Sequence, residues 1–256
     1  MINKMKKKAL ITGASGGIGL AVARRLAQQD YQLTLVARNE EKLEKVIEEL
    51  GDEHQLLVAD LANLDGVRLV MDHVANNNYN LLVNNAGVGT YGRFLEIELD
   101  DQFSAMRLNM DAVVALSHSF LEKATSGDAL VNIGSLLGHT SLPGGAVYAA
   151  TKSFVANFSE SLWYEFKDKG IFVMGFNPGA ADSEFHANAG RQTSDFPKFV
   201  VSRVADVADE LVSALEKRAK PRVVQGFKNR MMLFCFRWLG RASAVRIMGQ
   251  ISPGLR

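Results

Sequence analysis

Residues 9–19 read ALITGASGGIG, and this stretch decides the fold of the chain. Its first three residues predict a short buried strand, and apolar residues recur at helical spacing from Ile18 onward. Gly13, Gly17 and Gly19 therefore lie between a strand and the N-terminus of a helix. There the missing side chains let the backbone approach a pyrophosphate, and the helix dipole favours its negative charge. A glycine run alone would also fit a flexible loop, but this context indicates a nucleotide-binding turn.

Apolar runs and helical patterns alternate along the rest of the chain. Gly51 indicates the end of an acidic helix over 40–50, and Gly170 the end of a helix that runs to about Lys169. The alternation predicts an α/β fold with a doubly wound, Rossmann-like parallel sheet and helices on both faces. Since repeats and linkers rich in Pro, Gly or Ser are absent from the sequence, residues 1–256 are expected to form a single domain. Further strands are predicted at 32–36, 55–58, 81–83, 129–133 and 171–176.

Polar or small residues follow several of these predicted strands. Open α/β sheets bind their ligands at the carboxyl ends of the strands, where such residues meet at one edge. The sequence therefore predicts a binding site built from these strand ends. They are Asp60-Leu61, Asn84-Asn85-Ala86-Gly87, Gly134-Ser135 and Asn177-Pro178-Gly179.

Arg38 follows the second predicted strand, at the place where a site that prefers NAD carries Asp or Glu for the ribose 2′-hydroxyl. A guanidinium pairs instead with a 2′-phosphate through charge-assisted hydrogen bonds. The alternative is a solvated arginine in front of the acidic helix. We therefore infer from Arg38 that the site prefers NADP(H) over NAD(H).

Tyr148 and Lys152 lie four residues apart, so a helix would place the phenol and the ammonium on one face. A neighbouring cation favours the phenolate and lowers the pKa of the phenol. Such a pair can move a proton to or from an alcohol or carbonyl oxygen. Taken alone, the spacing also fits a partly buried tyrosine beside a solvated lysine. Asn109 stands out as well, because helix interiors disfavour an amide, although such a residue is often simply exposed.

Together these residues resemble the short-chain dehydrogenases/reductases in order and approximate spacing, from Lys8 to about Arg222. Each motif is modest on its own, whereas all of them in register are unlikely to coincide by chance. The resemblance rests on Thr12-Gly13-x-x-x-Gly17-x-Gly19, Asn84-Asn85-Ala86-Gly87, Ser135, Tyr148-x-x-x-Lys152 and Pro178-Gly179.

The resemblance implies a role for each matching residue. Tyr148 would be the general acid or base, and Lys152 would lower its pKa and hold the nicotinamide ribose. Ser135 would bind the substrate oxygen and stabilise its developing charge, and Asn109 would support a water-linked proton relay. Asp60 would meet the adenine amino group. The cofactor contacts implied in this way are Gly13, Ser15, Gly17, Ile18, Gly19, Arg38, Asp60, Leu61, Asn85, Ala86, Gly87, Tyr148, Lys152, Pro178, Gly179 and Ser183.

Two departures from the family pattern bear on the cofactor. Gly16 stands where many members that prefer NADP carry a second basic residue, so Arg38 has less help there. Ala181 and Ser183 stand where the family often has Val or Ile and then Thr. Ser183 keeps the hydroxyl that would bind the nicotinamide amide.

The composition sets limits on the class of protein. With 47% hydrophobic and 22% charged residues, the chain is an ordinary globular protein, and its net charge of +1 gives no reason to expect a nucleic acid partner. Cys235 is the single cysteine, which suits a reducing compartment. The apolar run 9–11 is too short for a signal peptide. We therefore expect a cytoplasmic protein, and the scattered histidines indicate no metal site.

Two segments are expected to choose the substrate and the surroundings. Residues 184–200 would form a substrate-binding loop, whose apolar side chains would cover a hydrophobic substrate or equally pack on the domain. Residues 223–256 form a basic, apolar tail, and no acidic residue follows Glu216. This tail would lie on an anionic membrane surface or, as we favour, pack on the cleft or on a second subunit. It resembles the tail of a subgroup of bacterial reductases of unsettled substrate. The loop contains Phe185, His186, Phe196 and Phe199 among polar residues.

The leading hypothesis is an NADP(H)-dependent oxidoreductase that interconverts a carbonyl and an alcohol. One alternative is a cofactor-binding sensor or scaffold without turnover, and another is a peripheral membrane reductase of a lipid-like ketone. The resemblance also implies a homodimer or homotetramer, formed through the helices that contain Asn109 and Tyr148.

Overall fold

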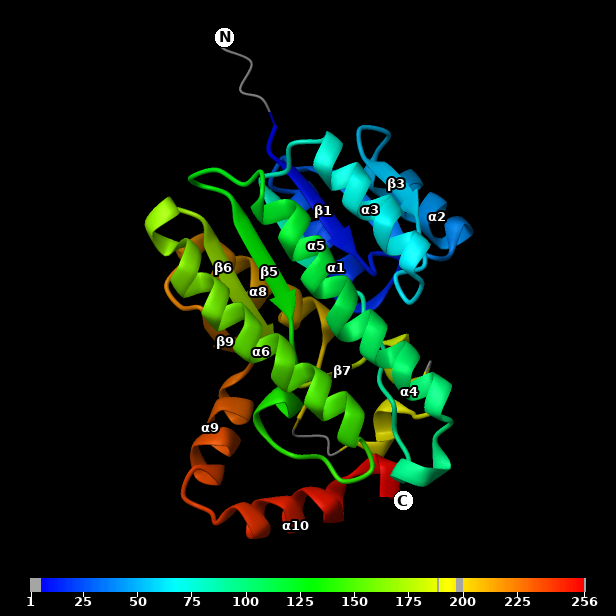
Figure 1. Ribbon diagram of the computed structural model, residues 1–256, viewed down its shortest axis with the longest axis vertical. Helices are drawn as coiled ribbons and strands as arrows, with labels where there is room; N and C mark the ends of the chain where they lie inside the picture. Colours follow the sequence, from blue (N-terminus) through cyan, green and yellow to red (C-terminus); the bar gives the residue numbers. More distant parts are fainter. Residues whose placement is uncertain (1–5, 188, 197–199, 256) are drawn as a thin grey trace.

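A parallel sheet forms the centre of the molecule in the computed structural model, which describes residues 6–187, 189–196 and 200–255. Its seven strands have the order β3-β2-β1-β4-β5-β6-β9, with helices on both faces (Figure 1). The predicted doubly wound α/β fold is therefore confirmed. The strands of this sheet are β1 (Lys8–Thr12), β2 (Gln32–Ala37), β3 (Gln55–Val58), β4 (Leu81–Asn84), β5 (Ala129–Ile133), β6 (Phe172–Asn177) and β9 (Arg222–Val224).

The order of the strands reverses next to β1, because β1 pairs with β2 on one side and with β4 on the other. A crevice forms at such a switch point, outside the carboxyl ends of the strands. The motifs that follow β1, β2 and β4 therefore meet at one place, although they are far apart in the sequence.

Strand β9 was missed by the sequence analysis, which assigned residues 223–256 to a tail. Its backbone pairs with β6, with Gly175 opposite Arg222 and Phe176 opposite Val223. It has only three residues, and its apolar run is limited to Val223 and Val224, which is shorter than the runs that marked the other strands. The tail proper therefore begins after this strand, and residues 222–224 belong to the sheet. A small second sheet pairs β7 (Ala180–Ala181) with β8 (Val201–Ser202).

Two apolar layers pack on the two faces of the sheet. Side chains alternate along each strand, so Ala9 and Ile11 contact one layer while Leu10 contacts the other. The first layer includes α1 (Gly17–Ala27), α2 (Glu40–Leu50) and α8 (Val204–Lys217). The second layer includes α3 (Leu64–Asn76), α5 (Ala112–Leu121) and α6 (Ala146–Phe166).

The helices that carry the predicted catalytic residues differ in detail from the sequence prediction. Helix α4 (Leu99–Met106) continues into a π-helical segment, Arg107–Asp111, before α5 begins. Asn109 thus lies in a widened turn rather than in a regular helix, and such turns are frequent at functional sites. Helix α6 ends at Phe166, and a 3₁₀ turn then leads to Gly170, whose φ of 71° ends the segment.

Three more helices lie outside these layers. Helix α7 (Glu184–Ala187) lies in the predicted substrate loop, and α9 (Phe227–Phe236) and α10 (Arg241–Ile251) follow β9. Figure 1 shows α9 and α10 beyond the carboxyl ends of the strands, where they close one end of the molecule. The part of the sequence interpreted as a tail therefore lies next to the predicted site.

Candidate active site

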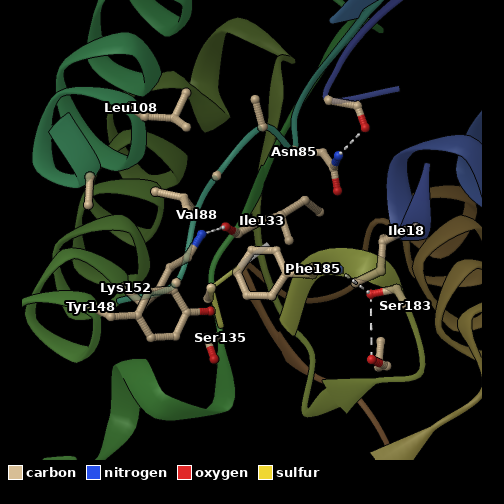
Figure 2. A pocket seen from close by; sticks show the side chains of 18 of the residues that line it. Ile18, Asn85, Val88, Leu108, Ile133, Ser135, Tyr148, Lys152, Ser183 and Phe185 are labelled. Atoms are coloured by element: carbon tan, nitrogen blue, oxygen red, sulfur yellow. Dashed lines mark hydrogen bonds between the residues drawn. The ribbon is translucent and has the colours of Figure 1, made fainter. Parts of the chain in front are cut away.

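A cleft of about 740 Å³ runs along the carboxyl edge of the sheet. It extends from the glycine turn before α1 to α10, and Figure 2 shows its central part. All of the residues predicted for the site line this cleft except Gly19 and Asn109. The structure thus brings together residues that come from the ends of six strands and from helix α6.

The glycine turn packs closely against the end of β4. Gly13 has a φ of 66°, and a Cβ atom there would lie 2.9 Å from the Cα of Ala86. A Cβ atom on Gly19 would collide with the carbonyl oxygen of Gly13. Gly16, which precedes α1, makes no side-chain cap, so the first amides of the helix remain available to a ligand. This turn fits the pyrophosphate of a dinucleotide.

Asn85 holds the glycine turn in place. Its Nδ2 donates hydrogen bonds to the carbonyl oxygens of Thr12 at 2.8 Å and Gly13 at 3.1 Å. The hydroxyl of Thr12 accepts from the amides of Asn85 and Ala86, both at 2.9 Å. The amide nitrogen of Asn85 is therefore occupied by the turn, while the residue itself lines the cleft.

Two cations lie at the end of the cleft where β2 stops. Arg38 is exposed there, and Lys42 lines the same end from the first turn of α2. Lys42 was not predicted from the sequence, although its spacing of four residues from Arg38 was a usable signal. Asn39 starts α2 by accepting a hydrogen bond from the Lys42 amide at 2.8 Å. The ammonium of Lys42 pairs with Glu184 of α7 at 2.7 Å, so the substrate loop reaches the nucleotide end of the cleft.

Asp60 lies where β3 leads into α3. Its Oδ1 accepts from the Ala62 amide at 3.0 Å and its Oδ2 from Asn63 Nδ2 at 2.8 Å. The carboxylate thus orders its own turn, and Leu61 beside it is buried against the cleft. Both residues line the cleft at the end of β3.

Tyr148 is buried beside Ser135, and its hydroxyl points toward that serine (Figure 2). Burial raises the pKa of Tyr148 to about 12, and the hydrogen bond with Ser135 acts in the opposite direction. From the sequence, the neighbouring lysine was expected to lower this pKa. In the structure, burial has the largest effect on this pKa and raises it, because the phenolate would be poorly solvated here. The phenol is therefore protonated near neutral pH.

Lys152 is buried one helical turn from Tyr148. Its Nζ donates a hydrogen bond to the carbonyl oxygen of Ile133 at 2.9 Å and lies 5.9 Å from the centre of the Tyr148 ring. Burial lowers the pKa of Lys152 to about 8. Gly87 leaves room for this ammonium, since a Cβ atom there would lie 3.4 Å from Nζ. The alternative of a solvated lysine is therefore wrong.

Asn109 is fully buried behind Lys152 and does not face the cleft directly. Its Oδ1 accepts from the Val88 amide at 3.0 Å, and its Nδ2 donates to the Val88 carbonyl oxygen at 2.9 Å and to Thr151 Oγ1 at 3.1 Å. These bonds fasten the loop after β4 to α6. The alternative of a merely exposed amide is wrong.

The nicotinamide end of the predicted site is formed by the segment after β6. The Pro178 carbonyl oxygen accepts a hydrogen bond from the Leu136 amide at 2.7 Å, which ties this segment to the loop of Ser135. Ser183 approaches the glycine turn, where a Cβ atom on Gly17 would lie 3.5 Å from the Ser183 Cβ. Figure 2 shows Ser183 beside Ile18, on the side of the cleft opposite Tyr148.

Aromatic and apolar side chains surround Tyr148 on the substrate side. The ring centres of Tyr91 and Phe185 lie 5.7 Å and 6.1 Å from that of Tyr148, and Phe196 packs on Tyr91 at 5.8 Å. Phe185 and Phe196 of the predicted loop thus face the cleft. Tyr91 was missed, because no local pattern marks it. Phe199 and the side chain of His186 lie outside the described residues.

The tail contributes to the same apolar pocket. Met232 of α9 and Met248 and Ile251 of α10 line the cleft. The favoured interpretation, that the tail packs on the cleft, is confirmed for this side of the two helices. Within the described part of the chain, no group of three His, Cys, Asp or Glu side chains could hold a metal ion.

Comparison with known proteins agrees with this geometry. The family model described as short chain dehydrogenase matches residues 7–194. Sulfoacetaldehyde reductase 2 of Chromohalobacter salexigens is 33% identical over 189 residues, which cover 71% of this chain and 75% of that protein. The chain therefore belongs to the short-chain dehydrogenase family, a family of oxidoreductases.

Solved structures share the fold over most of their length. A short-chain dehydrogenase of Sphingobium yanoikuyae in complex with NADPH has a TM-score of 0.81 and 29% identity, covering 90% of this chain and 93% of that one. The bulky-bulky ketone specific alcohol dehydrogenase of Comamonas testosteroni has a TM-score of 0.77 and 26% identity, covering 91% and 93%.

Proposed function

We propose that this protein is an NADP(H)-dependent oxidoreductase that interconverts a carbonyl and an alcohol. The observation that carries the proposal is the position of the Tyr148 hydroxyl. It lies beside Ser135, between a turn that fits a dinucleotide and a pocket of apolar side chains. A proton donor at such a boundary can reach an oxygen atom of a substrate held in the pocket.

Each member of the set has a part in the proposed reduction. Ser135 and Tyr148 bind the carbonyl oxygen, and Tyr148 donates its proton to that oxygen as it gains negative charge. Bound NADPH supplies the hydride to the carbonyl carbon. Lys152 stabilises the resulting phenolate through its charge, and Asn109 holds the loop and helix that position Lys152. Alcohol oxidation uses the same residues in reverse.

The preference for NADP(H) is proposed from Arg38 and Lys42 together. Gly16 stands where many family members that prefer NADP carry a second basic residue, and Lys42 supplies a second cation from α2 instead. The relative from Sphingobium yanoikuyae was solved with NADPH bound. Two cations at the end of β2 would pair with a 2′-phosphate by charge-assisted hydrogen bonds.

Replacing Arg38 by Ala should weaken NADPH binding about tenfold, or about 1.4 kcal/mol, and leave NADH binding nearly unchanged. The difference arises because only NADPH carries the phosphate that Arg38 would contact. Titration with each cofactor, followed by nicotinamide fluorescence, measures both affinities. Lys45→Ala is a matched control, since Lys45 is exposed on α2 and does not line the cleft. Equal loss of NADH binding in Arg38→Ala would contradict a phosphate contact.

The substrate is proposed to be a bulky, apolar carbonyl compound. Tyr91, Phe185, Phe196, Met248 and Ile251 all face the pocket, and among them only the Tyr91 hydroxyl is polar. The relative from Comamonas testosteroni is described as specific for bulky-bulky ketones. A lipid-like ketone, one of the alternatives from the sequence, belongs to this class.

Filling the pocket should discriminate between large and small substrates. Ile251→Trp is expected to lower kcat/KM for an aryl alkyl ketone about tenfold, with little change for a short aldehyde, because only the large substrate needs the occupied volume. Steady-state NADPH oxidation measures both values. Ile247→Trp is the matched control, since Ile247 lies one turn earlier on α10 and is 37% exposed. Similar losses for both substrates would contradict this position of the pocket.

The alternative of a cofactor-binding sensor or scaffold makes a different prediction. It requires NADPH binding without oxidation across a broad panel of aldehydes and ketones. The buried set of Ser135, Tyr148 and Lys152 favours turnover, because a binding protein has no need for a protonated phenol beside the substrate pocket. Turnover of any member of the panel that is lost in Tyr148→Phe would exclude the alternative.

We also propose a cytoplasmic homo-oligomer. The free thiol of Cys235 is exposed, which suits a reducing compartment. Phe103 on α4 and Val114 on α5 are exposed on the helices for which a subunit contact was expected, and Phe154 and Phe158 stack on α6. These apolar side chains would be covered in a dimer or tetramer. A monomer mass by light scattering would contradict this.

A further inference from the structure

Helices α9 and α10 form a hairpin whose two sides differ. Its inner side contributes Met232, Met248 and Ile251 to the cleft, and Phe236 packs against the same apolar cluster. Figure 1 shows the hairpin at one end of the molecule, and none of the described helices or strands lies on its outer side. The outer side is therefore free to contact something other than its own domain.

Large apolar side chains lie along the outer side of α9. Phe227, Met231 and Phe234 follow one another at helical spacing, and they are 67%, 45% and 55% exposed. Trp238 continues this stripe beyond the helix and is 80% exposed, with its ring 6.4 Å from that of Phe234. Single exposed apolar residues are normal, but a contiguous aromatic stripe marks an interaction surface.

Basic side chains surround this stripe. Lys228, Arg237 and Arg241 are exposed, and among the described residues no carboxylate lies within ion-pair distance of them. Arg230 is different, because it pairs with Glu210 of α8 at 2.8 Å. No acidic residue follows Glu216 anywhere in the sequence. The surface therefore combines exposed aromatic rings with basic side chains that have no acidic partner among the described residues.

We propose that this surface, made of Phe227, Met231, Phe234 and Trp238 with Lys228, Arg237 and Arg241, docks on an anionic lipid bilayer. Trp and Phe side chains insert at the level of the headgroups, while the cations attract anionic lipids. A uniform positive charge also opposes contact between two copies through the same surface. Within the described chain, no helix is long and apolar enough to cross a bilayer, so the contact is peripheral.

Docking in this orientation has a consequence for substrate access. The helices that contact the bilayer with their outer side line the apolar pocket with their inner side. A ligand dissolved in the bilayer would thus meet the pocket without a long path through water. The docking itself does not depend on the proposed reductase activity, so binding and turnover can be tested separately.

Co-sedimentation with phosphatidylglycerol vesicles and with phosphatidylcholine vesicles tests the proposal. The full chain should bind the anionic vesicles, with affinity that falls as salt rises, and bind phosphatidylcholine at least about tenfold more weakly. The double variant Arg237→Glu/Trp238→Ser should lose about tenfold or more in binding to the anionic vesicles. NADPH binding by that variant should remain normal, which shows that it is folded.

A matched control comes from the far end of α6. Tyr164 is 65% exposed, and the Lys167 ammonium lies 3.8 Å from the centre of its ring. Tyr164→Ser/Lys167→Glu thus removes an exposed aromatic ring and reverses one positive charge, as the test variant does. It should bind anionic vesicles as the unchanged protein does. Equal losses in both double variants would overturn the proposal, because net charge alone would then explain binding.

Fluorescence gives a second measurement. The sequence has two tryptophans, so Trp163→Phe leaves Trp238 as the sole reporter. Its emission should shift to shorter wavelength when anionic vesicles are added, since the indole leaves water. Absence of binding by the unchanged protein would overturn the proposal. So would a dimer that becomes monomeric in Arg237→Glu/Trp238→Ser, because a second copy would then be the partner of this surface.

Discussion

Replacement of Tyr148 by Phe should reduce carbonyl reduction at least about a thousandfold while NADPH binding stays within about twofold. The phenol is the proton donor in the proposed reaction, and its pKa of about 12 keeps it protonated across the working pH range. The ring is retained in the variant, so its packing against Tyr91 and Phe185 persists. NADPH oxidation at saturating substrate and nicotinamide fluorescence measure the two effects.

Tyr91→Phe is the matched control for this variant. Tyr91 is a second buried phenol, 5.7 Å from Tyr148 between ring centres, and burial raises its pKa well above the ordinary value. Because it lies farther along the substrate side, loss of its hydroxyl should cost about tenfold at most. Full activity in Tyr148→Phe together with a large loss in Tyr91→Phe would contradict the proposal, because Tyr91 would then be the proton donor.

Replacement of Lys152 by Met should have the second-largest effect, a loss of about a hundredfold in kcat at pH 7. Proton donation leaves a phenolate on Tyr148, and the nearby ammonium stabilises that negative charge. Methionine occupies a similar volume but carries no charge. The hydrogen bond to the Ile133 carbonyl oxygen is also lost, so NADPH affinity must be measured alongside to show that the cleft is intact.

The pH profile provides a readout specific to this lysine. Burial lowers the pKa of Lys152 to about 8, so the side chain is charged below that pH and neutral above it. Reduction by the unchanged protein should therefore fall as pH rises through about 8. In Lys152→Met this fall should disappear, because the titrating group is gone. Lys42→Met, measured at saturating NADPH, should keep it. A fall at the same pH in Lys152→Met would assign the titration to another group.

The sequence predicted the strands of the sheet well where a buried strand appears as a run of apolar residues. Strands β1 to β6 were each found to within two residues at either end, whereas β9 was missed because its apolar run has only two residues, Val223 and Val224. The widened turn at Asn109 was also missed, since no residue type marks a π-helical segment. The motifs marked the carboxyl ends of the strands, and a parallel sheet places these ends at one edge, so the location of the site could be predicted from the sequence.

The remaining features of the site depend on contacts between distant parts of the chain. Tyr91 comes from a loop with no local pattern, so only the fold places it beside Tyr148. Burial shifts the pKa values of Tyr148 and Lys152, and the spacing of these two residues in the sequence does not show that they are buried. From its composition, the tail was expected either to lie on a membrane surface or to pack on the cleft or a second subunit. In the structure its inner side packs on the cleft and its outer side remains exposed, because helical spacing separates the two sets of residues.

The short helix α7 links the two ends of the cleft. Glu184 pairs with Lys42 at the nucleotide end, and the next residue, Phe185, packs against Tyr148 at the substrate end. One segment thus contacts both compartments, so a bound dinucleotide that holds this segment would also hold Phe185 beside Tyr148 and complete the substrate pocket. We therefore expect an ordered kinetic sequence, in which the dinucleotide enters before the carbonyl compound and leaves after the alcohol.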